Sequence, residues 1–257
     1  MLNKIKQKAL EEHIPILMDD TLETIKEILI KEKPKKILEI GTAVGYSAIC
    51  FAKILLDNCK EKNILIDTIE LDEIRAKEAI ANISNMNLEN IIKVHIGNAV
   101  EILPAFNDKY DVIFIDAAKG KYPIFLKEAI RLSHKNSIIL ADNILYKGYV
   151  MSDYNKHKQR TAVTHLREYI KEAKENEILE TKILEVGDGL AISKVKEWFP
   201  KKPLLNINHP ALWGWEMFCL IHVGVLTQNY MSLPLIHKIR LDFYQVYHLL
   251  KVLPESP

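Results

Sequence analysis

The stretch KKILEIGTAVGYS, residues 35–47, decides the fold of this chain. It joins an apolar, β-prone run at 37–40 to a loop with two glycines and then to an apolar helical pattern. A buried strand, a glycine turn and a helix form the first unit of a parallel α/β sheet. The glycines have G-x-x-x-G spacing, unlike the G-x-G-x-x-G order of dinucleotide-binding turns. We expect Gly41 to permit a sharp turn and Gly45 to permit close approach of a ligand.

Strand and helix patterns alternate along the chain after this unit. We predict five strands, at 36–41, 64–71, 91–96, 111–116 and 137–142. Helices are predicted between them, at 46–56, 73–84, 99–103 and 122–132. A charged helix at about 158–175 then precedes two strands, 180–185 and 190–194, joined by the turn GDG. The pattern predicts a doubly wound, Rossmann-like α/β sheet, mostly parallel, with an antiparallel hairpin at one edge. A helical pattern over residues 2–31, broken near Pro15, comes before the sheet.

The composition favours one large domain followed by an extension. The chain has 257 residues and a formal net charge of +1, so no overall field draws it to nucleic acid or to a membrane. We assign residues 1–196 to the sheet domain and residues 197–257 to a C-terminal extension, which holds all three tryptophans. We expect the extension to pack on the domain; a partner-binding helix is the alternative.

The sequence also predicts a cytoplasmic protein without a membrane span. The three cysteines are widely spaced and form neither a disulfide framework nor a zinc pattern, so we expect reduced thiols. The first eight residues are lysine-rich and lack the apolar core of a secretory signal. No apolar run reaches membrane-spanning length.

Polar side chains follow two predicted strands that lie next to each other in the sheet. Asp116 and Lys119 come after VIFI, and Asp142 and Asn143 come after SIILA. Ligands of open parallel sheets bind outside the carboxyl ends of the strands. Asp116, Asp142 and Asn143 offer only oxygen atoms, which suit Mg²⁺ better than zinc, and Lys119 is near enough to accept a proton. Each residue alone also fits an ordinary turn cap or a surface lysine, but their shared position favours a metal site.

The ends of the other strands favour an adenosine ligand. Glu39 places a carboxylate at the glycine loop, which suits a cationic ligand and would repel a pyrophosphate. Glu70, at the end of the second strand, is placed to accept hydrogen bonds from ribose hydroxyls. Asn98 and Ala99 follow the third strand, where Asn98 fits an adenine contact, a helix N-cap, or both. Together these positions imply an adenosine without a phosphate chain, such as S-adenosylmethionine.

Four blocks of the sequence resemble the class I, metal-dependent S-adenosylmethionine O-methyltransferases of the catechol and caffeoyl-CoA type. The blocks are ILEIGTAVGYSA at 37–48, YDVIFIDAAKG at 110–120, DNILYKGYV at 142–150 and VGDGLAISK at 186–194. They are most similar to the subgroup of bacterial tRNA 5-hydroxyuridine methyltransferases. The likeness runs from about residue 13 to residue 194, and the extension has no counterpart in it. Asn98 stands where the family pattern often has aspartate.

The resemblance implies a function for particular positions. It implies Asp116, Asp142 and Asn143 as Mg²⁺ ligands and Lys119 as the catalytic base. A list of implied S-adenosylmethionine contacts follows from it: Leu17, Ser47, Glu70, Asn98, Ala99 and Asp116. It also implies a homodimer.

Two substrates, and one reading without catalysis, are compatible with these residues. The first hypothesis is methylation of the 5-hydroxyl of 5-hydroxyuridine at the wobble position of a tRNA anticodon loop, giving 5-methoxyuridine. A basic stretch supports it by offering phosphate contacts: Lys119, Lys121, Lys147, Lys156, His157, Lys158, Arg160 and Arg167. The alternative is a small-molecule catechol or caffeoyl-CoA-type O-methyltransferase. A non-catalytic adenosine-binding module is a third reading, which the intact set of acids, amide and lysine disfavours.

Overall fold

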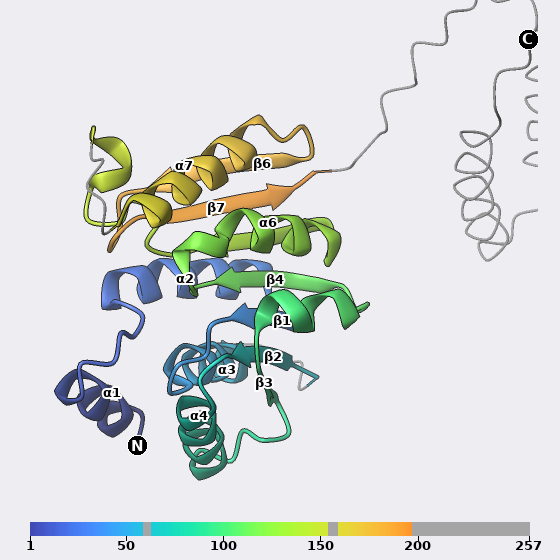
Figure 1. The fold of residues 1–257 in the computed structure, drawn as a ribbon. Helices are drawn as coiled ribbons and strands as arrows, with labels where there is room; N and C mark the ends of the chain where they lie inside the picture. Colours follow the sequence, from blue (N-terminus) through green and yellow to red (C-terminus); the bar gives the residue numbers. More distant parts are fainter. Residues whose placement is uncertain (59–62, 154–158, 197–257) are drawn as a thin grey trace, which may run out of the picture. The chain divides into compact units, whose positions relative to one another are not determined.

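A single seven-stranded sheet forms the centre of the computed structural model, which describes residues 1–58, 63–153 and 159–196 (Figure 1). The strand order is β3-β2-β1-β4-β5-β7-β6. The strands are β1 (Lys36–Ile40), β2 (Leu65–Glu70), β3 (Ile92–Ile96), β4 (Tyr110–Ile115), β5 (Ser133–Ala141), β6 (Leu179–Leu184) and β7 (Leu190–Val195). The five strands from β3 to β5 are parallel, whereas β7 pairs antiparallel with β5 and with β6. The predicted fold class is therefore confirmed.

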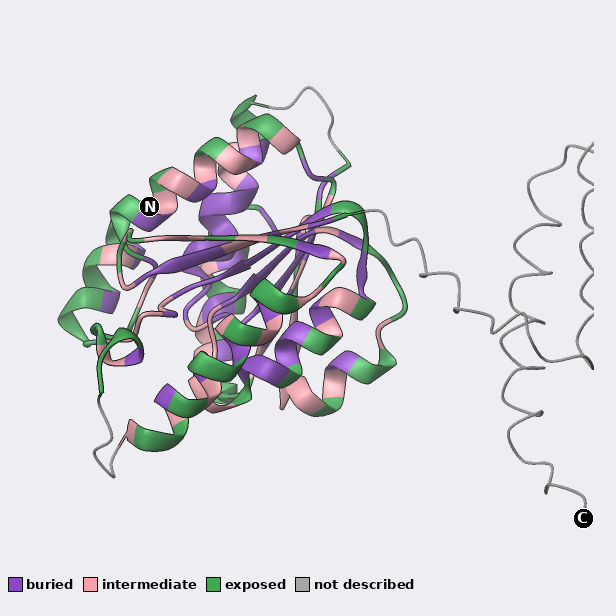
Figure 2. Cartoon of the chain, turned by 90° about the horizontal axis from the view of Figure 1, so that it is seen from above, coloured by how far each residue is buried: buried purple, intermediate pink, exposed green. Residues whose placement is uncertain are grey.

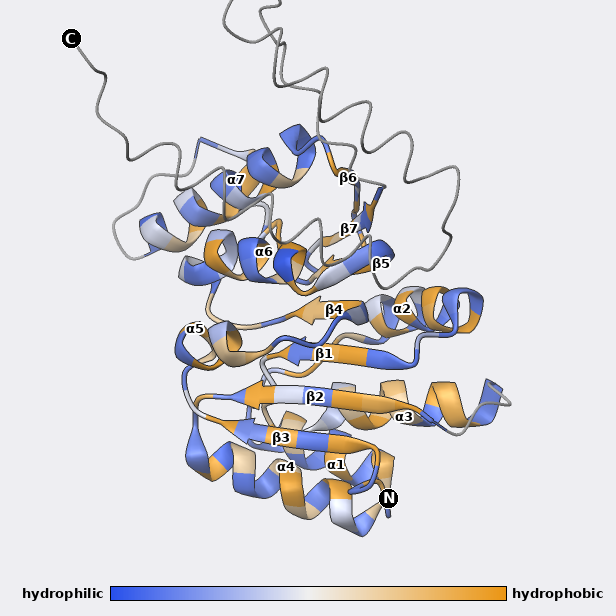
Figure 3. Ribbon diagram, turned by 90° about the vertical axis from the view of Figure 1, so that its right-hand side faces the viewer, coloured by the Kyte–Doolittle hydropathy of each residue, from blue (hydrophilic) through white to orange (hydrophobic). Residues whose placement is uncertain are grey.

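Helices cover both faces of the sheet, because its strands are apolar on both sides. One core cluster packs α1 (Leu2–Glu11), α2 (Asp19–Glu32) and α3 (Tyr46–Asn58) on one face, with α4 (Glu73–Asn85) beside them. The other cluster packs α5 (Ala99–Ile102), α6 (Tyr122–Arg131) and α7 (Arg160–Glu175) on the opposite face. Figure 2 shows the buried residues on the strands and on the helix sides that face them. The central strand β4 is hydrophobic along most of its length (Figure 3).

The order in which the strands are added to the sheet reverses between β1 and β4, which lie side by side. From β1 the chain moves through β2 to β3 at one edge, and then it crosses back to β4 and β5. The loops after β1 and β4 therefore leave the sheet side by side, and Asp116 N donates to Ile40 O at that point (2.9 Å). A crevice at such a switch point is the usual ligand site of open α/β sheets. The topology thus places the glycine loop beside Asp116.

Element boundaries agree with the sequence except at β5. The strand begins at Ser133 and not at Ser137, and its pairing with β4 shifts register between Tyr110 and Val112. Asn136 has a φ of +70°, as expected of a bulge. The exposed polar residues of this bulge carry no apolar alternation, so the pattern could not indicate a strand there.

Some predictions concern residues beyond those described. The C-terminal extension (197–257) and Lys156, His157 and Lys158 of the basic stretch lie outside the described ranges. No helix within the described residues is long and apolar enough to cross a bilayer. The boundary at residue 196 and the role of the extension stay predictions.

Candidate active site

A cavity of about 760 Å³ lies at the carboxyl ends of β1, β2, β4 and β5. It brings together predicted site residues that are far apart in the chain. They are Leu17, Gly41, Ser47, Glu70, Asn98, Ala99, Asp116, Lys119, Asp142 and Asn143. Two predicted residues, Glu39 and Gly45, are not among those that line it.

Lys119 lies at the centre of the polar end of the cavity. It begins a short 3-10 turn, Lys119–Lys121, that follows β4. Its Nζ donates to Asp116 Oδ1 and Asn143 Oδ1, at 2.9 Å each, and to the Tyr122 hydroxyl at 2.8 Å. The Lys119 side chain is only 16% exposed, so these contacts are screened from bulk water. Oxygens from two different strand ends therefore converge on one cation.

Asp142 is the most deeply buried of the predicted metal ligands, with 1% of its surface exposed. Its Oδ1 accepts the backbone N–H of Asn143 at 2.8 Å. Burial, reinforced by the nearby Asp116 carboxylate, raises the pKa of Asp142 to about 7. A positive charge beside Asp142 would favour the ionised form of this buried carboxylate.

The donor chemistry of this cluster fits a hard divalent cation. Asp116, Asp142 and Asn143 supply two carboxylates and one amide oxygen, with no sulfur or imidazole. Asp116 Oδ1 and Asn143 Oδ1 each lie 2.9 Å from Lys119 Nζ, so two of these donors face the same point. In the part of the chain that the structure describes, no group of three or more His, Cys, Asp or Glu side chains could hold a metal ion. A metal site here would need the amide of Asn143 as its third donor.

The glycine loop is held against the rest of the site by Glu70. One carboxylate oxygen, Oε2, accepts the backbone N–H groups of Thr42 (3.2 Å) and Ala43 (2.7 Å), and the other accepts the N–H of Asp72 (2.9 Å). Gly41 has a φ of +104°, and a Cβ there would come within 2.0 Å of Asp116 O. The loop therefore needs glycine at residue 41, as predicted. Glu70 also shapes the loop, in addition to offering an acceptor at the cavity.

Glu39 is not the exposed anion that the sequence predicts. It is fully buried on β1, and Thr68 donates to its Oε2. Burial raises the pKa of Glu39 to about 8, so the side chain is mostly neutral at pH 7. The expected negative charge facing a ligand is therefore wrong. Residue 39 pairs with Thr68 of the neighbouring strand β2, and its side chain is bound there and does not reach the cavity lining.

Gly45 serves packing and does not contact the cavity. Its φ is +82°, and a Cβ would lie 3.3 Å from the Cβ of Ala79 in α4. The close approach that glycine permits here is therefore between two elements of the protein, and the predicted close approach of a ligand is wrong. Glycine spacing alone does not distinguish these two uses.

Asn98 caps a helix, as the sequence predicts, while its predicted adenine contact stays a prediction. Its side-chain oxygen accepts the N–H of Val100 at 3.1 Å, which caps α5, and the residue also lines the cavity. Leu17, which is 3% exposed, comes from the segment before α2. Ser47 comes from the first turn of α3. Cavity walls from separate elements are expected of a site built on strand ends.

Sequence reasoning missed the part that the edge hairpin plays. The segment after β5 contains three non-glycine residues with positive φ: Asn143, Tyr146 and Lys147. Asp188, in the turn between β6 and β7, holds this segment, because its backbone oxygen accepts the N–H of Leu145 and its Oδ1 accepts the N–H of Lys147. Asp188 and Tyr146 also line the cavity, as do Arg75 and Phe125. Strained backbone at a site survives only where its surroundings fix it.

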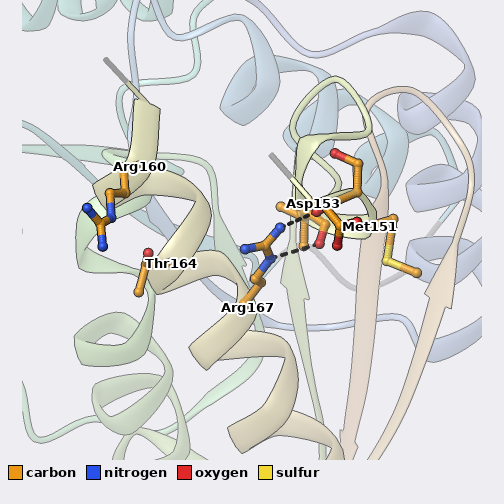
Figure 4. Close-up of a pocket in the computed structure, with 7 residues that line it drawn as sticks. Met151, Asp153, Arg160, Thr164 and Arg167 are labelled. Atoms are coloured by element: carbon orange, nitrogen blue, oxygen red, sulfur yellow. Dashed lines mark hydrogen bonds between the residues drawn. The ribbon is translucent and has the colours of Figure 1, made fainter. Parts of the chain in front are cut away.

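The basic residues near the site differ in what they are free to bind. Lys121, Lys147 and Arg160 are exposed, and Lys121 lines the cavity. Arg167 is already bound: it donates to the carbonyls of Val150 (3.0 Å) and Ser152 (Figure 4). It also donates to the carbonyl of Tyr149 at 3.1 Å. Figure 4 shows Arg167 directed at this segment while Arg160 lies apart from it. Arg167 therefore anchors the 149–152 segment to α7, and its role as a phosphate contact stays a prediction.

Comparisons with known proteins agree with this geometry. The O-methyltransferase family model matches residues 2–196. A catechol O-methyltransferase from Niastella koreensis is 34% identical over 171 residues, covering 63% of this chain and 74% of that protein. A Staphylococcus aureus structure provisionally named caffeoyl-CoA O-methyltransferase is 33% identical, with a TM-score of 0.69, and covers 76% of this chain and 91% of that chain. A Bacillus cereus O-methyltransferase solved in complex with SAH is 26% identical, with a TM-score of 0.67, and covers 76% and 90%.

Proposed function

Because this chain belongs to the O-methyltransferase family, we propose that it transfers the methyl group of S-adenosylmethionine to a hydroxyl of a small molecule with two adjacent oxygens, as in a catechol. The observation that carries this proposal is the convergence of Asp116, Asn143 and Lys119 at one end of the cavity. The Niastella koreensis protein is named for catechol and the Staphylococcus aureus protein for caffeoyl-CoA. These names favour a small molecule over the tRNA base that the sequence first indicates.

The residues that line the cavity support S-adenosylmethionine as the cofactor. Gly41 lets the glycine loop pack directly against the backbone of Asp116 at the cavity wall, where a Cβ would come within 2.0 Å of Asp116 O. Glu70 and Asn98 place an acceptor and a polar amide along the wall at the ends of β2 and β3. The Bacillus cereus relative was solved with SAH, the demethylated form of this cofactor. The cofactor would supply the methyl group, and these residues would bind its adenosine portion.

Glu70→Ala is expected to weaken S-adenosylmethionine binding by about 1.5–3 kcal/mol, the range for hydrogen bonds to a charged group. The loss has two sources: an acceptor at the cavity and the bonds that hold Thr42 and Ala43. Isothermal titration calorimetry would measure the dissociation constant. The control is Glu73→Ala, which removes an exposed carboxylate from the same region and lies outside the cavity lining. Equal dissociation constants for wild type and Glu70→Ala would refute the assignment.

The polar end of the cavity supplies the chemistry of the acceptor hydroxyl. Asp116, Asp142 and Asn143 would hold a Mg²⁺ ion, which lowers the pKa of a bound hydroxyl and orients it. Lys119, as a neutral amine, would accept the hydroxyl proton while the oxygen forms its bond to the methyl carbon and the sulfonium bond breaks. The sulfonium loses its positive charge when the methyl group leaves, and the proton carries a positive charge to Lys119.

Methylation of 5-hydroxyuridine in a tRNA remains the second candidate, because exposed basic residues lie near the cavity. Lys121 lines the cavity, and Lys147 and Arg160 are exposed on segments that follow β5. A 5-hydroxyuridine carries its 5-hydroxyl beside a carbonyl, so it offers two adjacent oxygens as a catechol does. Its recognition would require contacts to phosphates from these residues.

A comparison of two substrates separates the candidates. The chain would be assayed with catechol and with an anticodon stem-loop containing 5-hydroxyuridine, between about 50 and 200 mM salt. We expect turnover of catechol with little dependence on salt. The double variant Lys147→Glu, Arg160→Glu should leave that rate unchanged, as should the control Lys174→Glu at the far end of α7. Turnover of the stem-loop alone, falling steeply with salt and lost in the double variant, would establish the RNA substrate instead.

A further inference from the structure

Tyr122 is a fully buried residue beside the polar end of the cavity, and no step described so far uses it. It is the first residue of α6, and its ring packs edge-on against Tyr169 with centroids 5.6 Å apart. A large ring fixed in this way gives its hydroxyl a defined position.

The Tyr122 hydroxyl links the backbone at the end of β5 to the side chain of Lys119, which follows β4. It donates to Asp142 O at 2.8 Å, with Ile115 O more distant at 3.3 Å. Since the hydroxyl has one proton, it meets Lys119 Nζ, 2.8 Å away, as an acceptor. Lys119 is thereby held at a fixed distance from the residue proposed as the most buried metal ligand.

Of the three acceptors of Lys119, two belong to the proposed metal ligands. Asp116 and Asn143 would turn their oxygens to a divalent cation, whereas the Tyr122 hydroxyl is not part of that set. The contact to Tyr122 is therefore the one that does not compete with the metal. A lysine side chain has four rotatable bonds, and without such an anchor its amine would sample many positions.

We infer that Tyr122 is a positioning residue, whose hydroxyl holds the amine of Lys119 at the place where it takes the proton of the acceptor hydroxyl. The expected effect on kcat rests on the proposed function, whereas the expected effect on the position of Lys119 does not. A displacement of about 1 Å in a reacting group costs up to about 10²-fold in rate. Tyr122→Phe removes only the hydroxyl and keeps the buried ring.

The structural consequence is tested by chemical labelling of lysines in the full chain. An amine acylating reagent would be added briefly, and peptide mass spectrometry would give the labelling rate of Lys119 relative to Lys121. In Tyr122→Phe this ratio should rise by about threefold or more, because one of the three hydrogen bonds of Lys119 is lost. Tyr110→Phe is the control: it also removes a hydroxyl hydrogen bond, to Asp67, away from the cavity. An unchanged ratio in Tyr122→Phe would overturn the inference.

The kinetic consequence is tested with two catechols of different acidity, S-adenosylmethionine and Mg²⁺. With catechol, kcat of Tyr122→Phe should fall by about tenfold or more, with KM and the melting temperature close to those of Tyr110→Phe. With 4-nitrocatechol, whose hydroxyl is far more acidic, the fall should be much smaller, because a base contributes less to its ionisation.

The outcomes separate the inference from the proposed function. Equal losses with both catechols would show a general structural defect and would contradict a role through Lys119. No turnover of either catechol by the unchanged chain would count against the proposed function, while the labelling ratio would still decide whether Tyr122 holds Lys119. A raised ratio together with an acidity-dependent loss would support both.

Discussion

Asp142→Ala is expected to abolish metal-dependent methyl transfer, a loss of at least about 10³-fold, because the metal contributes several kcal/mol to the barrier. Asp142 is 1% exposed and its Oδ1 accepts the N–H of Asn143, so the protein fixes the position of this carboxylate. S-adenosylmethionine affinity should change little, since the residues proposed to bind adenosine lie at the ends of β2 and β3. Initial rates across a Mg²⁺ titration, with calorimetry for the cofactor, would measure both effects.

Two further variants show whether charge or structure is responsible. Asp142→Asn keeps an acceptor for the N–H of Asn143 and removes only the charge, so it should lose nearly as much activity. Asp111→Ala removes an aspartate that accepts the N–H groups of Lys35 and Lys36 at the other end of the sheet. It should keep the wild-type response to Mg²⁺. Activity of Asp142→Ala that still responds to Mg²⁺ as wild type does would remove Asp142 from the metal site.

Lys119→Ala is expected to lower kcat by roughly 10²–10⁴-fold, the usual contribution of a general base. The variant loses the group that the cavity holds closest to Asp116 and Asn143. Single-turnover rates with catechol would show the loss in the chemical step itself. Lys121→Ala is the matched control, because it removes an exposed lysine from the same short turn. A loss of less than about tenfold would exclude Lys119 from the role of base.

The activity of Lys119→Ala should depend on Mg²⁺ in a different way from the activity of Asp142→Ala. The remaining activity of Lys119→Ala should still require Mg²⁺, because the three oxygen donors are intact. A substrate with a more acidic hydroxyl should recover part of the loss, since its proton leaves without help. If Mg²⁺ no longer affects the variant, the lysine acts on the metal ligands and not on the substrate.

The sequence predicted the positions that depend on topology alone. Asp116, Asp142 and Asn143 meet because each follows a buried apolar strand, and parallel strands end at one edge of the sheet. Gly41 was predictable as well, because a sharp turn directly after a strand needs a residue that tolerates positive φ. These positions follow from local pattern and from one rule about sheets.

Other features depend on packing between distant segments and carry no local signal. Glu39 is surrounded by apolar neighbours in sequence, yet only the folded core shows that it is fully buried and that its pKa is raised. Gly45 meets Ala79 and not a ligand. Tyr122 and Asp188 lie in an ordinary helix start and an ordinary turn, and their contacts to the site arise when the chain folds.

The central claim is that Asp116, Asp142 and Asn143 hold a divalent cation beside the cofactor cavity. The most direct measurement is an anomalous difference map from crystals of the full chain grown with Mn²⁺ and S-adenosylhomocysteine, where Mn²⁺ stands in for Mg²⁺. The account predicts one strong peak about 2.1–2.2 Å from side-chain oxygens of all three residues, at distances typical of small hard cations. An ordered site with S-adenosylhomocysteine bound and no peak at these oxygens would contradict it.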